Sequence, residues 1–446
     1  MQDAIPISTV YDDGLFRVGK NQYSRTYKFE DINYQVASEA DKETMFERYC
    51  ALLNSLDSNA ATKITINNRK LNQADFENRI FIKEQDDNLN EYRREYNQML
   101  LAKATAGNSI MQEKYITVTV TEKSADDARQ YFNRFGASLA IQLNKLGSKC
   151  TDLDAIERLR IFYDFYRTGE ESDFAFDLKD SRRKGHSFKD YICPDSMEIQ
   201  KDHIALGERY ARVLFLKEYA NFLKDDFVTE LTTRCKNMML SIDMLPLPTG
   251  KAVREVETRL LGTETNITNW QRKQNANNNF SAEVPYDLEM QRQELREFLD
   301  DLSSRDQKMM LSVLTIVITA DTLDELNQQT KSMQELARER VSQIAVLKFQ
   351  QLDGLHTVLP AGMQKLDIFR TLITESLAIQ IPFRVQEIAH AKGIFYGQNV
   401  ISKNMILADR TQLLNGNSFI LGVSGSGKSF AAKCEITNHM LATDAD

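Results

Sequence analysis

The sequence predicts an α/β protein in which an N-terminal α+β region is followed by the first part of a parallel-sheet domain. Three observations support this fold class. Segments rich in β-branched and aromatic residues alternate with amphipathic helical segments along most of the chain. The same strand–helix pattern occurs in both halves, which indicates a possible internal repeat. Near the C-terminal end, a glycine-rich loop separates an apolar strand-like segment from a helical one.

Composition limits the class of protein. The chain has 446 residues, of which 42% are hydrophobic and 27% charged, so it is long enough for two or three globular domains. Its formal net charge of −8 and its pI of about 5.4 argue against a general nucleic-acid coat but leave a local basic patch open. The five cysteines lie far apart and form no CxxC pair. A zinc site or disulfide framework is therefore not expected, and a reducing cytosol is the natural compartment.

No export or membrane segment is expected. The first residues, "MQDAIPISTV", lack an apolar run behind a positively charged end. The longest strongly apolar stretch, 311–320, has about half of the ~20 residues that a membrane span needs. Its β-branched content favours a buried strand. We therefore expect a cytoplasmic protein that reaches a membrane only through partners.

The first half combines strands with two long helices. A polar helix is expected over 87–105, where Leu, Glu, Arg and Gln are frequent. Ser124 three residues before Asp127 predicts the start of an amphipathic helix, and Gly147 predicts its end. The strands expected in this half are 13–19, 24–36, 62–68 and 115–120.

The second half follows the same pattern. Val253 opens an amphipathic helix, and Thr322, with Glu325 three residues later, predicts another helix that continues to about Arg340. The strands expected here are 212–220, 237–245 and 311–320. Both halves thus contain a strand, a capped helix and further strands. An internal α/β repeat explains this similarity, and its chance occurrence in an ordinary α/β chain is the alternative.

Two polar stretches are expected to form loops. The stretch 172–191 contains the basic run Arg182–Lys184, and the stretch 269–285 is rich in Asn. The basic run could contact phosphate or acidic lipid, but a solvated loop is the more frequent role of such a run. Neither stretch predicts a catalytic site.

One motif predicts a chemical function. Gly422, Gly427, Lys428 and Ser429 match the Walker A pattern G-x-x-x-x-G-K-[ST]. We expect a short strand over 418–422 before this loop and a helix after it, which is the arrangement of a P-loop. The glycines allow successive backbone N–H groups to face a triphosphate, and the helix N-terminus adds partial positive charge.

The loop residues have distinct expected roles toward ATP and Mg²⁺. Lys428 is the candidate catalytic cation and contacts the β- and γ-phosphates, while the Ser429 hydroxyl binds Mg²⁺. Ser424 and Ser426 contribute backbone N–H groups. The expected ATP-binding residues are Gly422, Val423, Ser424, Gly425, Ser426, Gly427, Lys428, Ser429 and Phe430.

Hydrolysis of ATP needs further groups. A P-loop enzyme supplies an Asp to the Mg²⁺ shell, a residue that orients water and often an arginine from a partner subunit. Few residues follow Ser429, and no second strand fits among them. We therefore expect the chain to be the N-terminal part of a longer ATPase, truncated after Walker A and unable by itself to complete hydrolysis.

The flanks of the loop resemble one protein family. Pro382–Phe383, "GIFYGQN" at 393–399, "NGN" at 415–417 and "GSGKSF" at 425–430 resemble the conjugative-transfer ATPases of type IV secretion systems. This is the CagE/TrbE-type family of the HerA/FtsK-like P-loop group. Upstream strings such as "KGHSFKDYICPDS" and "FQQLDGLHTVLPAG" resemble its variant on Gram-positive conjugative elements. The resemblance covers nearly the whole chain.

The resemblance implies a fold, an assembly and a role. It implies a RecA-like P-loop domain and a hexameric ATPase at the inner face of the cell membrane, which energises channel assembly or the transfer of DNA or protein. Other secretion-channel subunits would be its partners, with DNA contact only indirect. The domains expected are 1–150 (first α/β region), 151–200 (polar connection), 201–380 (second α/β region with long helices) and 381–446 (incomplete P-loop domain).

Two other functions stay open. A DNA-translocating coupling-type motor is one, although such proteins generally begin with membrane-spanning helices. A non-catalytic docking or scaffold module is the other, because the residues before Phe383 contain no catalytic constellation. Packing or surface roles are expected for Trp270, His203 and His390, and helix-cap or solvated roles for the pairs Asp86–Asp87 and Asp225–Asp226.

Overall fold

The fold was analysed in a computed structural model of the chain. It describes residues 2, 5–70, 73–106, 110–220, 223–277, 279, 282–305, 307–390, 393–412 and 415–442. The loop expected over 269–285 is wrong in part, because residues 269–276 are the last turns of the helix Thr249–Ala276. Residues 278, 280 and 281 of this stretch and the side chain of Arg182 lie outside the described residues.

A large mixed α/β body is built on one sheet of 13 strands, in the order β1-β2-β3-β5-β4-β10-β11-β9-β8-β7, with β6, β12 and β13 alongside. All pairings are antiparallel, as expected for the N-terminal region. The first-half strands are β1 (Thr9–Val10), β2 (Phe16–Gly19), β3 (Gln22–Phe29), β4 (Ala60–Lys70), β5 (Ile110–Thr121) and β6 (Cys150–Asp152). The others are β7 (Met197–Ile199), β8 (Ile204–Leu206), β9 (Arg209–Glu218), β10 (Met238–Pro246), β11 (Met309–Ala320), β12 (Gln343–Val346) and β13 (Arg370–Ile373).

The sheet contains the same unit twice. In the first half the strands lie in the order β6-β3-β5-β4, and in the second half in the order β12-β9-β11-β10. Each unit runs strand, helix, strand, strand, helix, strand along the chain, which is the ferredoxin-like βαββαβ arrangement. A short hairpin strand also precedes each unit and pairs with its first strand. The repeated pattern in the sequence therefore corresponds to a repeated topology.

The two units join along β4 and β10. Thr65 lies opposite Ser241, and their hydroxyls are 2.9 Å apart. Lys63 lies opposite Asp243, and the Lys63 Nζ is 2.7 Å from Asp243 Oδ1. Both charged side chains are buried. A buried charge is tolerated when it is paired, so this ion pair satisfies two groups that burial would otherwise destabilise.

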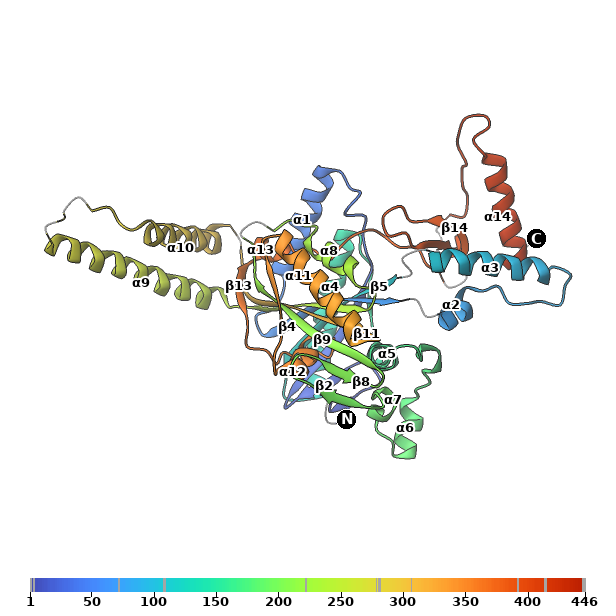
Figure 1. Cartoon of the computed structure of the whole chain (residues 1–446), viewed down its shortest axis with the longest axis horizontal. Helices are drawn as coiled ribbons and strands as arrows, with labels where there is room; N and C mark the ends of the chain where they lie inside the picture. Colours follow the sequence, from blue (N-terminus) through green and yellow to red (C-terminus); the bar gives the residue numbers. More distant parts are fainter. Residues whose placement is uncertain are drawn as a thin grey trace.

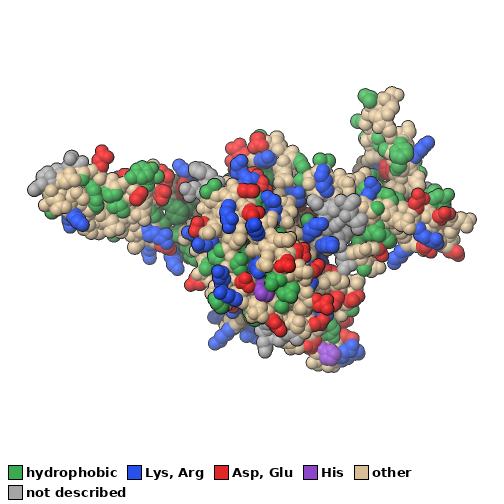
Figure 2. Space-filling view, in the orientation of Figure 1, with side chains coloured by type: hydrophobic (Ala, Val, Ile, Leu, Met, Phe, Trp, Pro, Cys, Tyr) green, Lys and Arg blue, Asp and Glu red, His purple; other side chains and the backbone are tan. Residues whose placement is uncertain are grey.

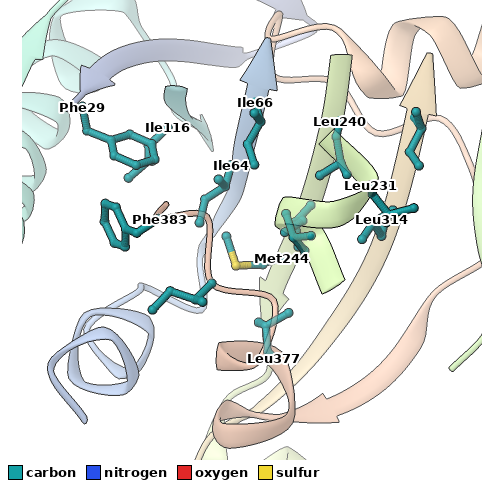
Figure 3. Packing of buried hydrophobic residues seen from close by; sticks show 14 of the residues in the cluster. Phe29, Ile64, Ile66, Ile116, Leu231, Leu240, Met244, Leu314, Leu377 and Phe383 are labelled. Atoms are coloured by element: carbon teal, nitrogen blue, oxygen red, sulfur yellow. The ribbon is translucent and has the colours of Figure 1, made fainter. Parts of the chain in front are cut away.

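Four helices cover one face of the sheet. They are α1 (Glu39–Asn54), α4 (Ala125–Leu146), α8 (Phe227–Arg234) and α11 (Leu323–Glu339). Alternate strand residues such as Ile64, Leu240 and Leu314 point to this face and form one apolar core with helix residues such as Leu231 (Figure 3). The predicted caps are confirmed, because Ser124 accepts a hydrogen bond from the Asp127 amide and Thr322 accepts one from the Glu325 amide. The helix starts predicted in the two halves are thus correct.

The opposite face is covered by α5 (Ala155–Tyr166), by α12 (Gln351–Val358) and by the segment 359–363. Here the sheet presents polar side chains, and the segment presents its carbonyl groups to them. Ser241 donates to the Val358 carbonyl at 2.5 Å, and Ser24 donates to the Ala361 carbonyl at 2.6 Å. These bonds satisfy buried hydroxyls that an apolar cover would leave unpaired.

Each unit carries a two-helix arm between its second and third strands. The first arm consists of α2 (Gln73–Ile80) and α3 (Asn90–Ala106), and the second of α9 (Thr249–Ala276) and α10 (Tyr286–Ser304). In Figure 1 the arms extend to opposite ends of the long axis. The helix predicted over 87–105 is confirmed as α3, and the helix that opens near Val253 as α9.

The polar stretch 172–191 was expected to be a loop, and that expectation is wrong in part. It contains a short 3-10 turn, Glu171–Asp173, followed by α6 (Leu178–Lys184) and α7 (Phe188–Ile192). Local capping explains the difference. Asp177 accepts bonds from the amides that begin α6, and Ser187 and Asp190 form a capping box at α7.

The C-terminal part departs from the predicted parallel sheet. After α13 (Thr374–Ala378), the chain forms the antiparallel hairpin β14 (Ile394–Gln398) and β15 (Met405–Ala408), then a 3-10 turn (Arg410–Gln412) and α14 (Lys428–Ala442). The strand predicted over 418–422 is wrong, because residues 415–423 form no strand. A parallel strand needs a neighbour to complete its hydrogen bonds, and no described segment pairs with this one. In the described ranges, no helix combines the length and apolar content that crossing a membrane requires.

A candidate nucleotide site at the glycine-rich loop

The loop has the backbone that its sequence predicts. Gly425 and Gly427 adopt φ values of 78° and 86°, in the left-handed region that glycine populates freely. Gly422 is constrained differently, since a Cβ atom there would lie 2.6 Å from the Ser426 hydroxyl oxygen. The loop folds tightly enough for Ser426 N to bond the Val423 carbonyl at 3.3 Å. A larger residue would strain the backbone at Gly425 and Gly427, whereas at Gly422 it would displace the Ser426 side chain.

The amides of this loop are available to a ligand. The helix α14 begins at Lys428, directly after the loop. Within the described part of the chain, the backbone N–H groups of Gly425, Gly427, Lys428, Ser429 and Phe430 have no acceptor. Unpaired N–H groups and the dipole of a 15-residue helix favour a bound anion at this end.

The Lys428 ammonium turns back over the start of the loop. Its Nζ donates to the Gly422 carbonyl at 2.8 Å and to the Val423 carbonyl at 2.7 Å. These partners are neutral, so a phosphate oxygen would bind the cation more strongly in their place. The geometry thus brings together the loop amides and the single cation that the sequence singled out.

The remaining predicted residues lie at the surface. Val423, Ser424, Ser429 and Phe430 are exposed, with Val423 at 79% and Phe430 at 74%. No cluster of three or more His, Cys, Asp or Glu side chains that could hold a metal occurs among the described residues. A magnesium ion at Ser429 would therefore need ligands from the nucleotide and from water.

A clamp of three side chains, Tyr396, Arg410 and Glu435, lies beside the loop. Glu435, on α14, accepts a 2.7 Å hydrogen bond from the Tyr396 hydroxyl of β14. The same carboxylate pairs with Arg410, whose second terminal nitrogen donates to the Gly416 carbonyl just before the loop. The clamp therefore connects the helix that follows the loop, the segment that enters it and the hairpin.

Electrostatics agrees with this geometry. The hydrogen bond from Tyr396 and the neighbouring Arg410 lower the pKa of Glu435 below its usual value of 4.5. Burial and the Glu435 carboxylate raise the pKa of Tyr396 to about 12. At neutral pH the clamp thus contains a neutral phenol, a carboxylate and a guanidinium, which is the protonation state that its hydrogen bonds need.

The first arm packs against this C-terminal segment (Figure 1). The Tyr96 hydroxyl accepts a bond from the Phe395 amide at 3.3 Å, and the buried Arg93 donates through Nε to the Leu441 carbonyl at 3.0 Å. Phe395 and Met405 of the hairpin also pack on an apolar cluster of α2 and α3. Sequence reasoning missed this contact, because no motif relates α3 to residues so far along the chain.

Other predicted candidates lie elsewhere. Trp270 is half-buried on α9, consistent with the expected packing role. His203 and His390 do have partners: His203 bonds Asp202 at 2.9 Å, and His390 Nδ1 accepts from the Asp409 amide at 2.9 Å. Among the acidic pairs, Asp87 accepts from the Leu89 amide but also pairs with the buried Arg93. The cap role expected of the pair Asp225–Asp226 is wrong, because Asp226 makes no capping bond to α8 and pairs with Arg340, while Asp225 accepts from the Tyr34 hydroxyl. His390 is relevant to the site, because it fixes the residue next to Arg410.

The protein also contains a cavity of about 810 Å³, but it is not at the loop. Its walls come from the end of α5, from the turn between β8 and β9 and from the end of β11, at residues such as Arg167, Glu208 and Asp321. Comparison with protein-family models and with curated proteins finds no match for this chain. The function must therefore be argued from the loop and its surroundings.

Proposed function

We propose that this chain binds ATP with Mg²⁺ at residues 422–430 and is the ATP-binding motor protein of a conjugative type IV secretion system. The observation that carries the nucleotide part is the coincidence at one point of left-handed glycines, unpaired amides, a helix N-terminus and the Lys428 ammonium. In P-loop proteins these elements contact phosphate together.

The proposed roles follow from these positions. The amides of Gly425, Gly427 and Lys428 bind phosphate oxygens, and Lys428 Nζ leaves its two carbonyl partners for the β- and γ-phosphates. Ser429 gives its hydroxyl to Mg²⁺. Apolar side chains on both sides of the loop are strongly exposed, including Phe419 at 89% and Ile436 at 67%. Figure 2 shows hydrophobic side chains on the surface of this C-terminal segment, which supports its burial against another protein surface.

We propose binding rather than efficient turnover for this chain. Hydrolysis needs a carboxylate in the Mg²⁺ shell and a group that orients water. The nearby carboxylate of Glu435 is already engaged by Tyr396 and Arg410. Under this proposal a second chain supplies the catalytic groups.

The secretion role is supported by the resemblance of residues 382–383, 393–399 and 415–430 to conjugative-transfer ATPases. Under this proposal the protein forms a hexamer and associates with the inner face of the membrane through channel subunits. The second arm, α9–α10, supports such contacts, because it extends from the body and presents Leu261 and Tyr286 at 66% and 75% exposure. A docking module without ATP chemistry is the second candidate, and the large sheet body favours it.

Calorimetric titration with ATP and Mg²⁺ tests the nucleotide proposal. We expect wild-type protein to bind, and Lys428→Ala to weaken binding about tenfold to a hundredfold, because a charged contact to phosphate is lost. Lys433→Ala is the control, since Lys433 is an exposed lysine on the same helix. Absence of binding by the wild type would leave only the docking function.

A further inference from the structure

We propose that Arg410 is a positioning residue for the phosphate loop, acting through Glu435 and the Gly416 carbonyl. This inference rests on the proposed nucleotide site and adds a residue to it that lies outside the Walker A motif. Arg410 is 18 residues before Lys428 in the sequence, and no consensus spacing predicts it.

The phosphate loop is an exposed segment. Residues 415–427 are exposed and belong to no strand. Among the described residues, contacts of this stretch to the rest of the chain are few, and the Arg410 bond to the Gly416 carbonyl is one of them. Without it, the loop would still be tied to α14 through the Lys428 bonds to the Gly422 and Val423 carbonyls, and these are the bonds that Lys428 would give up on binding phosphate. A loop that must order on binding loses affinity through conformational entropy.

Arg410 is attached at two points of this region, to Glu435 and to the Gly416 carbonyl. Its guanidinium pairs with Glu435 through one terminal nitrogen and bonds Gly416 through the other. Glu435 lies two turns after Lys428 on the helix whose N-terminus faces the ligand. One planar group thus fixes the entry of the loop and its exit helix in a single geometry. A lysine has one flexible ammonium and cannot reproduce this fork.

Arg410 is itself held in place by its neighbour Asp409. The Asp409 amide bonds His390, and the Asp409 carboxylate accepts bonds from the Thr411 amide at 3.0 Å and hydroxyl at 2.6 Å. The side chains of Arg410 and Glu435 are 24% and 18% exposed, so water screens their pair only in part. The Tyr396 bond fixes the Glu435 carboxylate from the hairpin side. Through Glu435 and Tyr396 the loop is therefore held in a fixed position relative to β14, and β14 packs on α3.

The test measures the affinity for ATP with Mg²⁺ and the thermal unfolding of the full 446-residue chain. We expect Arg410→Ala to weaken binding about threefold to tenfold with an unchanged unfolding temperature, and Arg410→Lys to recover part of the loss. Glu435→Gln should weaken binding less than Arg410→Ala. The double variant should lose no more than Arg410→Ala alone, because both residues act through one contact.

The control is Arg259→Ala, which removes an arginine paired with Glu255 on the distant second arm. Wild-type affinity in Arg410→Ala, or additive losses in the double variant, would overturn the positioning role. So would a loss of affinity that follows a loss of folded protein. If the wild type binds no nucleotide at all, the proposed function fails; if the wild type and Arg410→Ala bind equally while Lys428→Ala binds more weakly, only the positioning role fails.

Discussion

At the scale of single residues, a carboxylate in the sheet is paired with cations from neighbouring strands. Glu113 on β5 accepts bonds from Lys28 Nζ at 2.6 Å, from Arg69 Nη2 at 3.1 Å and from the Tyr115 hydroxyl at 2.8 Å. Burial raises the pKa of this carboxyl, but the charges of Arg69 and Lys28 outweigh burial and lower the pKa from 4.5 to about 2. The cluster thus connects β3, β4 and β5 of the first unit.

This cluster makes stability depend on acid pH. Because the folded pKa of Glu113 lies below the unfolded value of 4.5, its contribution is present above pH 4.5 and is lost as the pH falls toward 2. We expect the free energy of unfolding of the wild type to fall over this range. Glu113→Gln should be less stable at neutral pH and should show a smaller fall. Urea unfolding at several pH values measures both quantities.

The exposed Glu294 on α10 offers a matched control for this measurement. Glu294→Gln should follow the wild-type profile, because its side chain is exposed and lies outside the Glu113 cluster. If the free energy of unfolding of Glu113→Gln falls at acid pH as much as that of the wild type, other carboxyls produce the pH dependence.

Residue-level prediction succeeded where one local motif was sufficient. The caps at Ser124 and Thr322 and the end of α4 at Gly147 follow from short patterns, and the structure places them as expected. Arg410, Glu435 and Arg93 could not be found in this way. The contacts Arg410–Glu435 and Arg93–Leu441 join residues 25 or more positions apart along the chain, so they exist only after folding.

At the scale of elements, the first arm is the support of the C-terminal segment. Arg93 contacts the end of α14, and the Tyr96 hydroxyl contacts β14. We expect Arg93→Ala to increase amide hydrogen exchange in α14 about tenfold, because a buried charged hydrogen bond to its last turn is lost. Exchange measured by mass spectrometry reports this for each peptide.

Arg94→Ala is the natural comparison for that measurement, because Arg94 is the next residue and its side chain is 64% exposed. It should leave exchange in α14 unchanged. Equal exchange in the two variants would show that α14 is held by contacts other than Arg93.

Element prediction from the sequence was reliable for strands and helices with strong periodicity. The expected strand over 62–68 is the centre of β4, and the expected strand over 311–320 lies within β11. It failed where an element depends on a distant neighbour or on local side-chain caps. Residues 418–422 have strand composition but no pairing partner, whereas 178–184 have loop composition but a capping Asp177.

At the scale of the whole molecule, the two units share one sheet and should be stable only together. Separation at residues 168–196 would expose β4 on one part and β10 on the other, both central strands. We expect fragments 1–180 and 181–446 to be poorly soluble alone and to copurify when coexpressed, because pairing restores the hydrogen bonds of both strands.

A proline at Thr65 tests whether the pairing of β4 with β10 holds the two fragments together. Thr65 lies in the middle of β4, between β5 and β10, and proline there removes a ladder hydrogen bond. Thr65→Pro in the first fragment should abolish copurification. If the fragments still copurify after this change, they are held together by contacts outside the β4–β10 pairing.

The sequence could not reveal how the two units join. Periodicity shows that β4 and β10 are strands, but both have apolar residues on one face and polar residues on the other, and either could have formed a sheet edge. The register that places Lys63 against Asp243 is a property of the folded pair. The expected domain limits at 150, 200 and 380 stay predictions, while the sheet continues across the first two.

The position of the two arms has a consequence for how such a protein can diversify. Each arm occupies the turn between neighbouring strands, at the rim of the sheet, so its length is independent of every strand register. An insertion or deletion at either turn changes how far the arm extends without changing the residues of the core. The duplicated architecture thus offers two separate places where new recognition elements can be grafted, and in this chain the two arms differ in helix length and extend to opposite ends of the molecule.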